Sequence, residues 1–137
     1  MSGSNKKIKG CGVHHISMHV RDLEKSITFY EALGFEVKYS WGKAPKKTVL
    51  MDTGDGNYFE MSQGDPEAEY PEGVFRHLAL RADDAKAALE LARKAGAEVT
   101  IEARDVKLSS VPPIPIRIAF FKGPDGELIE LFQDEET

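Results

Sequence analysis

The sequence predicts an α+β fold in which two tandem βαβββ modules form a curved mixed sheet, a half-barrel, with the helices on its outside. Three observations lead to this prediction. They are an internal repeat, a strand-like alternation at the start of each copy, and a helix-like segment after each of these strands that ends at a glycine. The chain has 137 residues, enough to bury a core without disulfide bonds.

The two copies begin 62 residues apart, because residues 13–20 align with residues 75–82. The alignment continues through the next segment. Asp22 at its start aligns with Asp84, and Gly34 at its end aligns with Gly96. Near the end of each copy the offset is 70, because 55–60 aligns with 125–130, so the second copy has 8 extra residues. We expect a flexible tail at 1–10, modules at 11–63 and 74–133, a linker at 64–73 and a C-terminal tail at 134–137.

Each module begins with a strand and a helix. In the first strand apolar and polar side chains alternate from His15 to Val20, which gives it one face of each kind. Asp22 is the expected helix N-cap, and Asp83 or Asp84 has this role in the second module. Leu89 and Leu91 are expected to pack the second helix.

Three strands then complete each module. They are expected at 35–41, 47–52 and 57–62, with counterparts at 97–102, 116–122 and 127–133. Asp-Gly turns at 55–56 and 125–126 join the last two strands of each module. The extra residues fall in 103–115, where three prolines argue against a helix or a central strand. This segment is expected to be a surface connection or a semi-rigid lid.

Two histidines and two glutamates occupy matching positions in the copies. His15 and His77 begin a module's first strand, and Glu60 and Glu130 lie between apolar neighbours in its last strand. Strand alternation turns all four away from the helix and toward a shared cavity. Two imidazoles and two carboxylates suit a six-coordinate divalent ion with two open positions, and Ni, Co, Zn, Mn and Fe all fit. The further candidates, for substrate contact, are His19, Trp41, Tyr58 and Phe132.

Composition excludes several functions. The 18 Lys and Arg against 23 Asp and Glu give a net charge of −5, and no basic cluster exists, which argues against nucleic acid and anionic membranes as partners. The longest apolar run, 118–121, is far shorter than a membrane span of about 20 residues. Cys11 is the single cysteine and a bystander, so a reducing, cytoplasmic location is expected.

The segments 15–30, 77–80 and 123–131 resemble the vicinal oxygen chelate superfamily, and the resemblance covers about 11–133. This superfamily includes glyoxalase I, methylmalonyl-CoA epimerase, fosfomycin-resistance transferases, bleomycin-binding proteins and extradiol dioxygenases. Bacterial glyoxalase I is the most similar, since its metal ligands come in the order His, Glu, His, Glu. The resemblance thus implies one divalent ion per site, held by His15, Glu60, His77 and Glu130.

The resemblance also implies a lactoylglutathione lyase-like isomerase or lyase. Glu60 or Glu130 would remove a proton next to a carbonyl of a small oxygen-bearing substrate, and the metal would stabilise the enediolate. Glutathione-dependent members carry Arg and Asn where this chain has His19 and Gly64, which argues against a glutathione hemithioacetal as substrate. An epimerase, a β-eliminating lyase and a non-catalytic antibiotic-binding protein remain alternatives. A homodimer is expected, because edge strands and half-cavities need covering.

Overall fold

A computed structural model of the chain describes residues 13, 15–67, 77–108 and 112–135. The chain divides into two compact units, Met1–Glu69 and Tyr70–Thr137, and each unit is described by itself. The expected N-terminal tail, Cys11 and most of the predicted linker lie outside the described residues. Within the described part of the chain, neither helix has the length and apolar character needed to cross a membrane.

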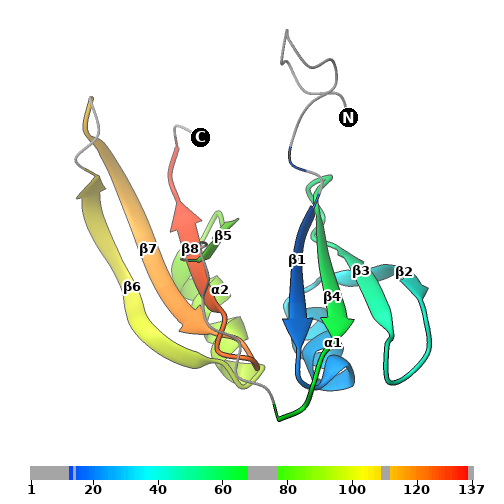
Figure 1. The fold of residues 1–137 in the computed structure, drawn as a ribbon. Coiled ribbons are helices and arrows are strands. Elements are labelled where there is room, and N and C mark those ends of the chain that lie inside the picture. The colour runs from blue at the N-terminus through cyan, green and yellow to red at the C-terminus, as the bar shows by residue number, and fades with distance from the viewer. Residues whose placement is uncertain (1–12, 14, 68–76, 109–111, 136–137) are drawn as a thin grey trace, which may run out of the picture. The chain divides into compact units, whose positions relative to one another are not determined.

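Unit 1 has the predicted order of one strand, one helix and three strands (Figure 1). Its elements are β1 (His15–Val20), α1 (Leu23–Ala32), β2 (Glu36–Trp41), β3 (Thr48–Asp52) and β4 (Tyr58–Gln63). The sheet order is β1-β4-β3-β2, in which β1 is parallel to β4 and the other neighbours are antiparallel.

Unit 2 repeats this arrangement. Its elements are β5 (Leu78–Arg81), α2 (Ala85–Lys94), β6 (Glu98–Leu108), β7 (Ile114–Lys122) and β8 (Leu128–Gln133). The sheet order is β5-β8-β7-β6, again with one parallel pair, β5 with β8. The predicted α+β class with two βαβββ modules is confirmed, and each module has a mixed four-stranded sheet of its own.

Both helices are bounded as the sequence predicts. Asp22 and Asp84 are the N-caps, and each side chain accepts a hydrogen bond from the backbone N–H three residues later, at 3.1 and 2.9 Å. Each helix stops before a glycine in the left-handed region, Gly34 at φ +90° and Gly96 at φ +99°. The second cap is therefore Asp84, the later of the two expected aspartates.

The last strand of each sheet ends at a glutamine, and these two residues, Gln63 and Gln133, occupy matching positions in the repeat. Gln63 Oε1 accepts a hydrogen bond from the backbone N–H of Leu23 at 2.9 Å, and Gln133 Oε1 accepts one from Ala85 at 2.8 Å. In both units the residue that donates is the first of the helix, where backbone N–H groups have no partner within the helix. The two glutamines therefore tie the last strand of each sheet to the start of its helix.

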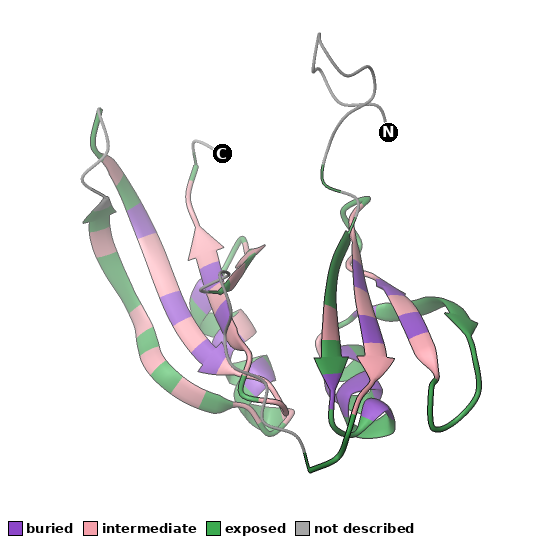
Figure 2. Cartoon of the chain, viewed as in Figure 1, coloured by how far each residue is buried: buried purple, intermediate pink, exposed green. Residues whose placement is uncertain are grey.

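Each helix packs on one face of its own sheet, and the inner strands β4 and β8 alternate accordingly between buried and partly exposed residues (Figure 2). In unit 1 the core contains four aromatic rings, with Tyr30 in contact with the other three: Phe29, Phe35 and Phe59. Tyr30 is fully buried. Because Phe59 directly precedes Glu60, this core fixes the backbone of the strand that carries the carboxylate.

In unit 2 the prediction for Leu91 is wrong. Leu89 is 1% exposed and packs in the core, whereas Leu91 is 48% exposed. Two residues along a helix correspond to a rotation of about 200°, so the two leucines lie on nearly opposite faces. The remaining buried positions of α2 are Ala85 and Ala92, which keep this helix close to its sheet.

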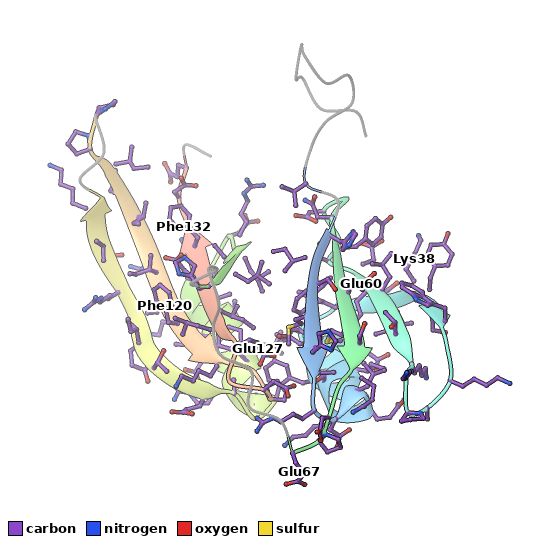
Figure 3. All side chains as sticks on the ribbon, viewed as in Figure 1. Lys38, Glu60, Glu67, Phe120, Glu127 and Phe132 are labelled. Carbon is purple, nitrogen blue, oxygen red and sulfur yellow. The ribbon has the colours of Figure 1, made fainter. Side chains whose placement is uncertain are left out.

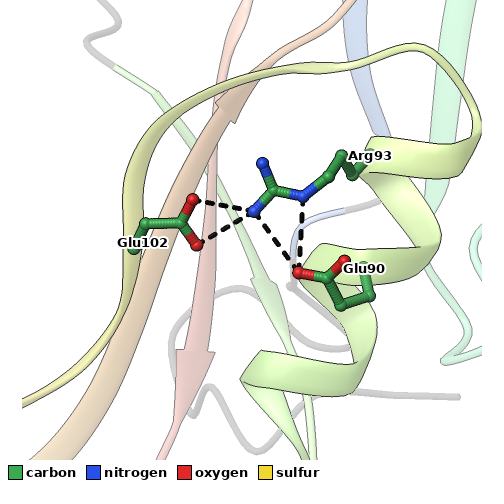
Figure 4. A network of polar contacts seen from close by, with 3 residues as sticks. All are labelled: Glu90, Arg93 and Glu102. Atoms are coloured by element: carbon green, nitrogen blue, oxygen red, sulfur yellow. Dashed lines mark hydrogen bonds and ion pairs between the residues drawn. The ribbon is translucent and has the colours of Figure 1, made fainter.

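The outer face of α2 is linked to β6 by charged side chains (Figure 4). Arg93 Nη2 lies 2.8 and 2.9 Å from the two carboxylate oxygens of Glu102, and 3.3 Å from Glu90 Oε1. The hydrogen bonds to Glu102 and Glu90 raise the pKa of Arg93. All three side chains are well exposed, so we expect the network to contribute little to stability.

The prediction that the prolines exclude a central strand from 103–115 is wrong, and most of this segment belongs to β6 or β7. Residues 103–108 continue β6, and β7 begins at Ile114, so the two strands form a ribbon that extends beyond the rest of the sheet. Pro115 stands opposite Lys107 in this ribbon, whereas β8 pairs with β7 only from Arg117 onward. Pro115 thus has a neighbour on one side only, where a missing N–H is tolerated.

Candidate functional site

The face of each sheet turned away from its helix carries the candidate residues, and we call it the site face. In unit 1 the strand register arranges the site face in three rows across the sheet. The rows are His15, Tyr58, Asp52 and Glu36; Ser17, Glu60, Leu50 and Tyr39; and His19, Ser62, Thr48 and Trp41. Glu60 is therefore in the middle row, and His15 is in the row next to it.

Unit 2 has matching rows on its own sheet. The middle row contains Ala79, Glu130, Phe120 and Ile101, and the row beyond it contains Arg81, Phe132, Ile118 and Arg104. His77 directly precedes β5 and corresponds to His15. The apolar residues between the two arginines make this face less polar than the site face of unit 1.

The structure brings His77 and Glu130 together. Nε2 of the imidazole lies 3.0 Å from Oε2 of the carboxylate, and the side chains are 33% and 12% exposed. The ring of Phe120 on β7, a residue labelled in Figure 3, meets the His77 ring edge to face, with centroids 5.5 Å apart. Phe120 therefore restricts the orientation of the imidazole that faces Glu130.

Glu60 has a different kind of neighbour on the site face of unit 1. Ser17 stands opposite it on β1, and the Ser17 hydroxyl donates a hydrogen bond to Glu60 Oε1 at 2.7 Å. His15 stands opposite Tyr58, one row away. The first module thus presents an imidazole and a carboxylate on neighbouring rows, and the carboxylate is already oriented by a hydroxyl group.

The expected substrate contacts all lie on a site face, but not in one place. Tyr58 shares a row with His15, and His19 and Trp41 occupy the two ends of the third row. Trp41 is 48% exposed on the edge strand β2. Phe132 lies on the sheet of unit 2, one row beyond Glu130 (Figure 3). Tyr58 and Phe132 are therefore the candidates nearest to the carboxylates within their units.

The donor atoms suit a divalent first-row ion, which binds imidazole nitrogen and carboxylate oxygen at about 2.0–2.2 Å. Two neighbouring ligands at right angles on such an ion are roughly 3 Å apart, and the His77–Glu130 separation is 3.0 Å. Among the residues that the structure describes, no group of three or more His, Cys, Asp or Glu converges. Each unit supplies one His and one Glu, so the four-residue centre stays a prediction.

Ser17 is a functional candidate that sequence reasoning missed. A serine on the polar side of a strand has no chemical signature of its own, because most such hydroxyls face water. The available signal was a difference within the repeat, since Ala79 stands at the position equivalent to Ser17. Glu60 and Glu130 therefore match in sequence but differ in their surroundings.

Comparison with known proteins agrees with this arrangement. The model of the Glyoxalase/Bleomycin resistance protein/Dioxygenase superfamily matches residues 12–131. Over 130 residues, 90% of this chain and 91% of the relative, the chain is 34% identical to a probable lactoylglutathione lyase of Vibrio parahaemolyticus. It is 33% identical to the lactoylglutathione lyase of Escherichia coli O157:H7 over 132 residues, 90% of this chain and 93% of that enzyme.

Solved structures show the same fold. The trypanothione-dependent glyoxalase I of Leishmania major is similar to this chain with a TM-score of 0.69 and 25% identity, over 90% of this chain and 86% of that one. The match to the family model spans both modules, including the four histidine and glutamate positions. The chain therefore belongs to the Glyoxalase/Bleomycin resistance protein/Dioxygenase superfamily.

Proposed function

We propose that the chain is a divalent-metal-dependent isomerase or lyase of the glyoxalase I type, which removes a proton next to a carbonyl group. The observation that supports this most directly is the pair of His77 Nε2 and Glu130 Oε2, 3.0 Å apart on the site face of unit 2. The relatives named lactoylglutathione lyase, at 33% and 34% identity, agree with a reaction of this class.

His15, Glu60, His77 and Glu130 would hold the ion in this proposal. When bound, the ion supplies a Lewis acid that stabilises negative charge developing on the substrate's oxygen atoms. The protein supplies the base, since a carboxylate within reach of the carbon-bound proton can accept it and return it to a neighbouring carbon. Glu60 and Glu130 are the two carboxylates at the middle of the site faces.

The substrate is proposed to be small and oxygen-bearing, and different from a glutathione hemithioacetal. His19 stands on the site face of unit 1 where an arginine would recognise the anionic tail, and imidazole lacks the fork of donors that binds a carboxylate through two bonds. Gly64 has no side chain, and its backbone N–H donates to the Val20 carbonyl at 2.7 Å. Neither position offers a carboxylate-binding side chain of the kind found in glutathione-dependent members.

The first test is metal stoichiometry followed by proton exchange. The purified protein is reconstituted with Ni, Co, Zn, Mn or Fe and analysed for bound metal. It is then incubated in deuterated water with hemithioacetals of methylglyoxal made with glutathione or with an uncharged thiol. We expect one ion per four-residue site, and deuterium incorporation that is faster with the uncharged thiol. Loss of metal in His77→Ala would tie the ion to this site.

Two outcomes would contradict the proposal. Failure of the wild-type protein to bind any of the five ions would remove its basis. Tight binding of small carbonyl compounds without deuterium exchange would instead favour the non-catalytic binding protein. Faster exchange with the glutathione hemithioacetal would leave the reaction class intact and correct the substrate.

A further inference from the structure

The two carboxylates of the proposed site have different partners, although they occupy the same position in the repeat. Glu60 stands opposite Ser17, whose Oγ lies 2.7 Å from Glu60 Oε1. Glu130 stands opposite Ala79, which offers a methyl group in place of the hydroxyl. The Glu130 carboxylate faces His77 instead, at 3.0 Å. At the position opposite this glutamate, the two modules thus differ by one hydroxyl group.

The Ser17–Glu60 contact has the geometry of a strong hydrogen bond. Its length of 2.7 Å falls in the range for a hydroxyl that donates to a carboxylate, a class roughly twice as strong as a bond between neutral groups. The strands β1 and β4 are adjacent and parallel, and their register fixes the two backbones relative to each other. A glutamate on a strand has several side-chain rotamers, and this bond selects one of them.

The bond occupies only part of the carboxylate. A carboxylate has about four lone-pair sites on two oxygens, and Ser17 uses one site on Oε1. The other oxygen, Oε2, is then available for a metal ion from a side chain that is already oriented. Hydrogen-bond partners that orient metal ligands in this way typically change metal affinity by about 10- to 100-fold when they are removed.

We propose that Ser17 is a positioning residue that holds Glu60 ready to bind the divalent ion, whereas Glu130, which stands opposite Ala79, is oriented by His77 instead. The inference rests on the proposed function, because it assigns Glu60 a role toward the ion of that site. It makes the two halves of a repeated site unequal, with Glu60 oriented by a hydroxyl group and Glu130 by the His77 imidazole.

The test compares metal affinity in four variants by calorimetric titration with Ni²⁺ or Zn²⁺. Ser17→Ala should weaken binding by about 10- to 100-fold, and Ser17→Thr, which keeps a hydroxyl on a strand, should restore most of it. Ser62→Ala is the matched control, because Ser62 is a hydroxyl one row away that bonds to Thr48 at 2.9 Å. The double variant Ser17→Ala with Ala79→Ser should still bind the metal weakly. Its new hydroxyl at position 79 stands opposite Glu130, which His77 already orients, and does not restore the bond to Glu60.

A second readout does not need the metal. Carbon-13 labelling of the glutamate carboxyls, with Glu60→Gln to assign the Glu60 signal, reports whether Ser17→Ala changes the environment of Glu60 in the metal-free protein. We expect the Glu60 signal to move and the Glu130 signal to stay. Thermal melting of all variants checks that Ser17→Ala leaves the fold unchanged, as expected for an exposed side chain.

The outcomes separate the inference from the proposed function. If the wild type and Ser17→Ala bound the metal with equal affinity, the inference would be overturned and the proposed function would stand. An unmoved Glu60 signal, or recovery of affinity in the double variant, would overturn it as well. Absence of metal binding by the wild-type protein would refute the proposed function, and the inference would fall with it.

Discussion

The carboxylate of Glu130 lies 3.0 Å from the imidazole of His77, on the face of the unit 2 sheet that its helix leaves uncovered. Strand register sets the position of Glu130 on β8, and His77 directly precedes the neighbouring strand β5. Glu130 stands opposite Ala79 on the neighbouring parallel strand, and His77 is two residues before Ala79, so the two side chains lie on the same face. Phe120 contacts the imidazole from the third strand. Glu130 is therefore carried by a strand inside the sheet, and Phe120 restricts the imidazole beside it, as a site that binds an ion or moves a proton requires.

The first prediction concerns Glu130. Glu130→Gln keeps the size of the side chain and removes its ability to accept a proton or to bind a cation as a charged ligand. We expect turnover of an accepted substrate to fall by about 10²- to 10⁴-fold, the usual contribution of a general base. Steady-state assays of the metal-reconstituted protein measure this fall.

The matched control is Glu102→Gln, which changes an exposed glutamate of the same unit that binds Arg93. It should keep full turnover, so that any loss in the first variant belongs to the site face. Turnover by Glu130→Gln within about threefold of the wild type would remove Glu130 from the catalytic residues.

The second prediction concerns Gln63 and Gln133, which accept a hydrogen bond from the first residue of each helix. Gln63 makes three side-chain hydrogen bonds: it accepts one from the Leu23 N–H and donates to the carbonyls of Arg21 and Gly64. Among the described residues, Gln133 makes one, which it accepts from the Ala85 N–H. Gln63→Ala should therefore lower the free energy of unfolding by about 1–3 kcal/mol, more than Gln133→Ala. Urea denaturation of both variants measures the difference. The variant Gln63→Glu keeps the acceptor and loses both donor bonds. Its free energy of unfolding should lie between those of the wild type and Gln63→Ala.

Much of the fold could be predicted from the sequence because it is repeated. A strand alternation that recurs at a fixed offset defines which residues share a face, and this was enough to place Glu130 and His77 on one face. The caps at Asp22 and Asp84 follow from local chemistry, since a carboxylate at a helix start satisfies a free N–H. These features depend on neighbours in the sequence or on the strand period.

Other features depend on partners that no local pattern identifies. Proline is read as a strand breaker, yet Pro115 sits in β7 because that end of β7 has no β8 neighbour. Leu91 has the same apolar character as Leu89. Only the face of α2 that packs on the sheet decides that Leu89 is buried and Leu91 exposed. Ser17 gains its role from the residue across the strand pair, which the register decides. The meeting of all four metal-ligand candidates involves two separate units and stays a prediction.

The third prediction uses the two leucines of α2. Leu89 is buried and Leu91 is 48% exposed, so the same substitution should have different costs. Leu89→Ala should lower the free energy of unfolding by about 2–5 kcal/mol, because it leaves a cavity between α2 and its sheet. Leu91→Ala should change it by less than about 0.5 kcal/mol. Chemical denaturation of the two variants in parallel gives both values, and equal losses would mean that Leu91 is covered in solution.

The last prediction concerns Asp55, in the turn that leads into the strand carrying Glu60. The hydrogen bond from the Thr53 hydroxyl, and then the one from the Asn57 backbone N–H, lower the pKa of Asp55 below its ordinary value of 3.8. A carboxyl group whose pKa is lowered on folding stabilises the folded state above its unfolded pKa. This stabilisation is lost as the pH falls through the lower, folded pKa.

Asp55→Ala should therefore reduce the free energy of unfolding by roughly 0.5–1 kcal/mol at about pH 7, since the turn is largely exposed to solvent. The difference from the wild type should shrink when the pH falls below 3.8, the ordinary value of this carboxyl. Urea unfolding of both proteins at about pH 7 and about pH 3 provides the comparison. Asp83→Ala, an exposed carboxylate before the second helix, controls for the change in net charge. A difference that stays constant down to the lower pH would show that the Asp55 charge has no part in holding this turn.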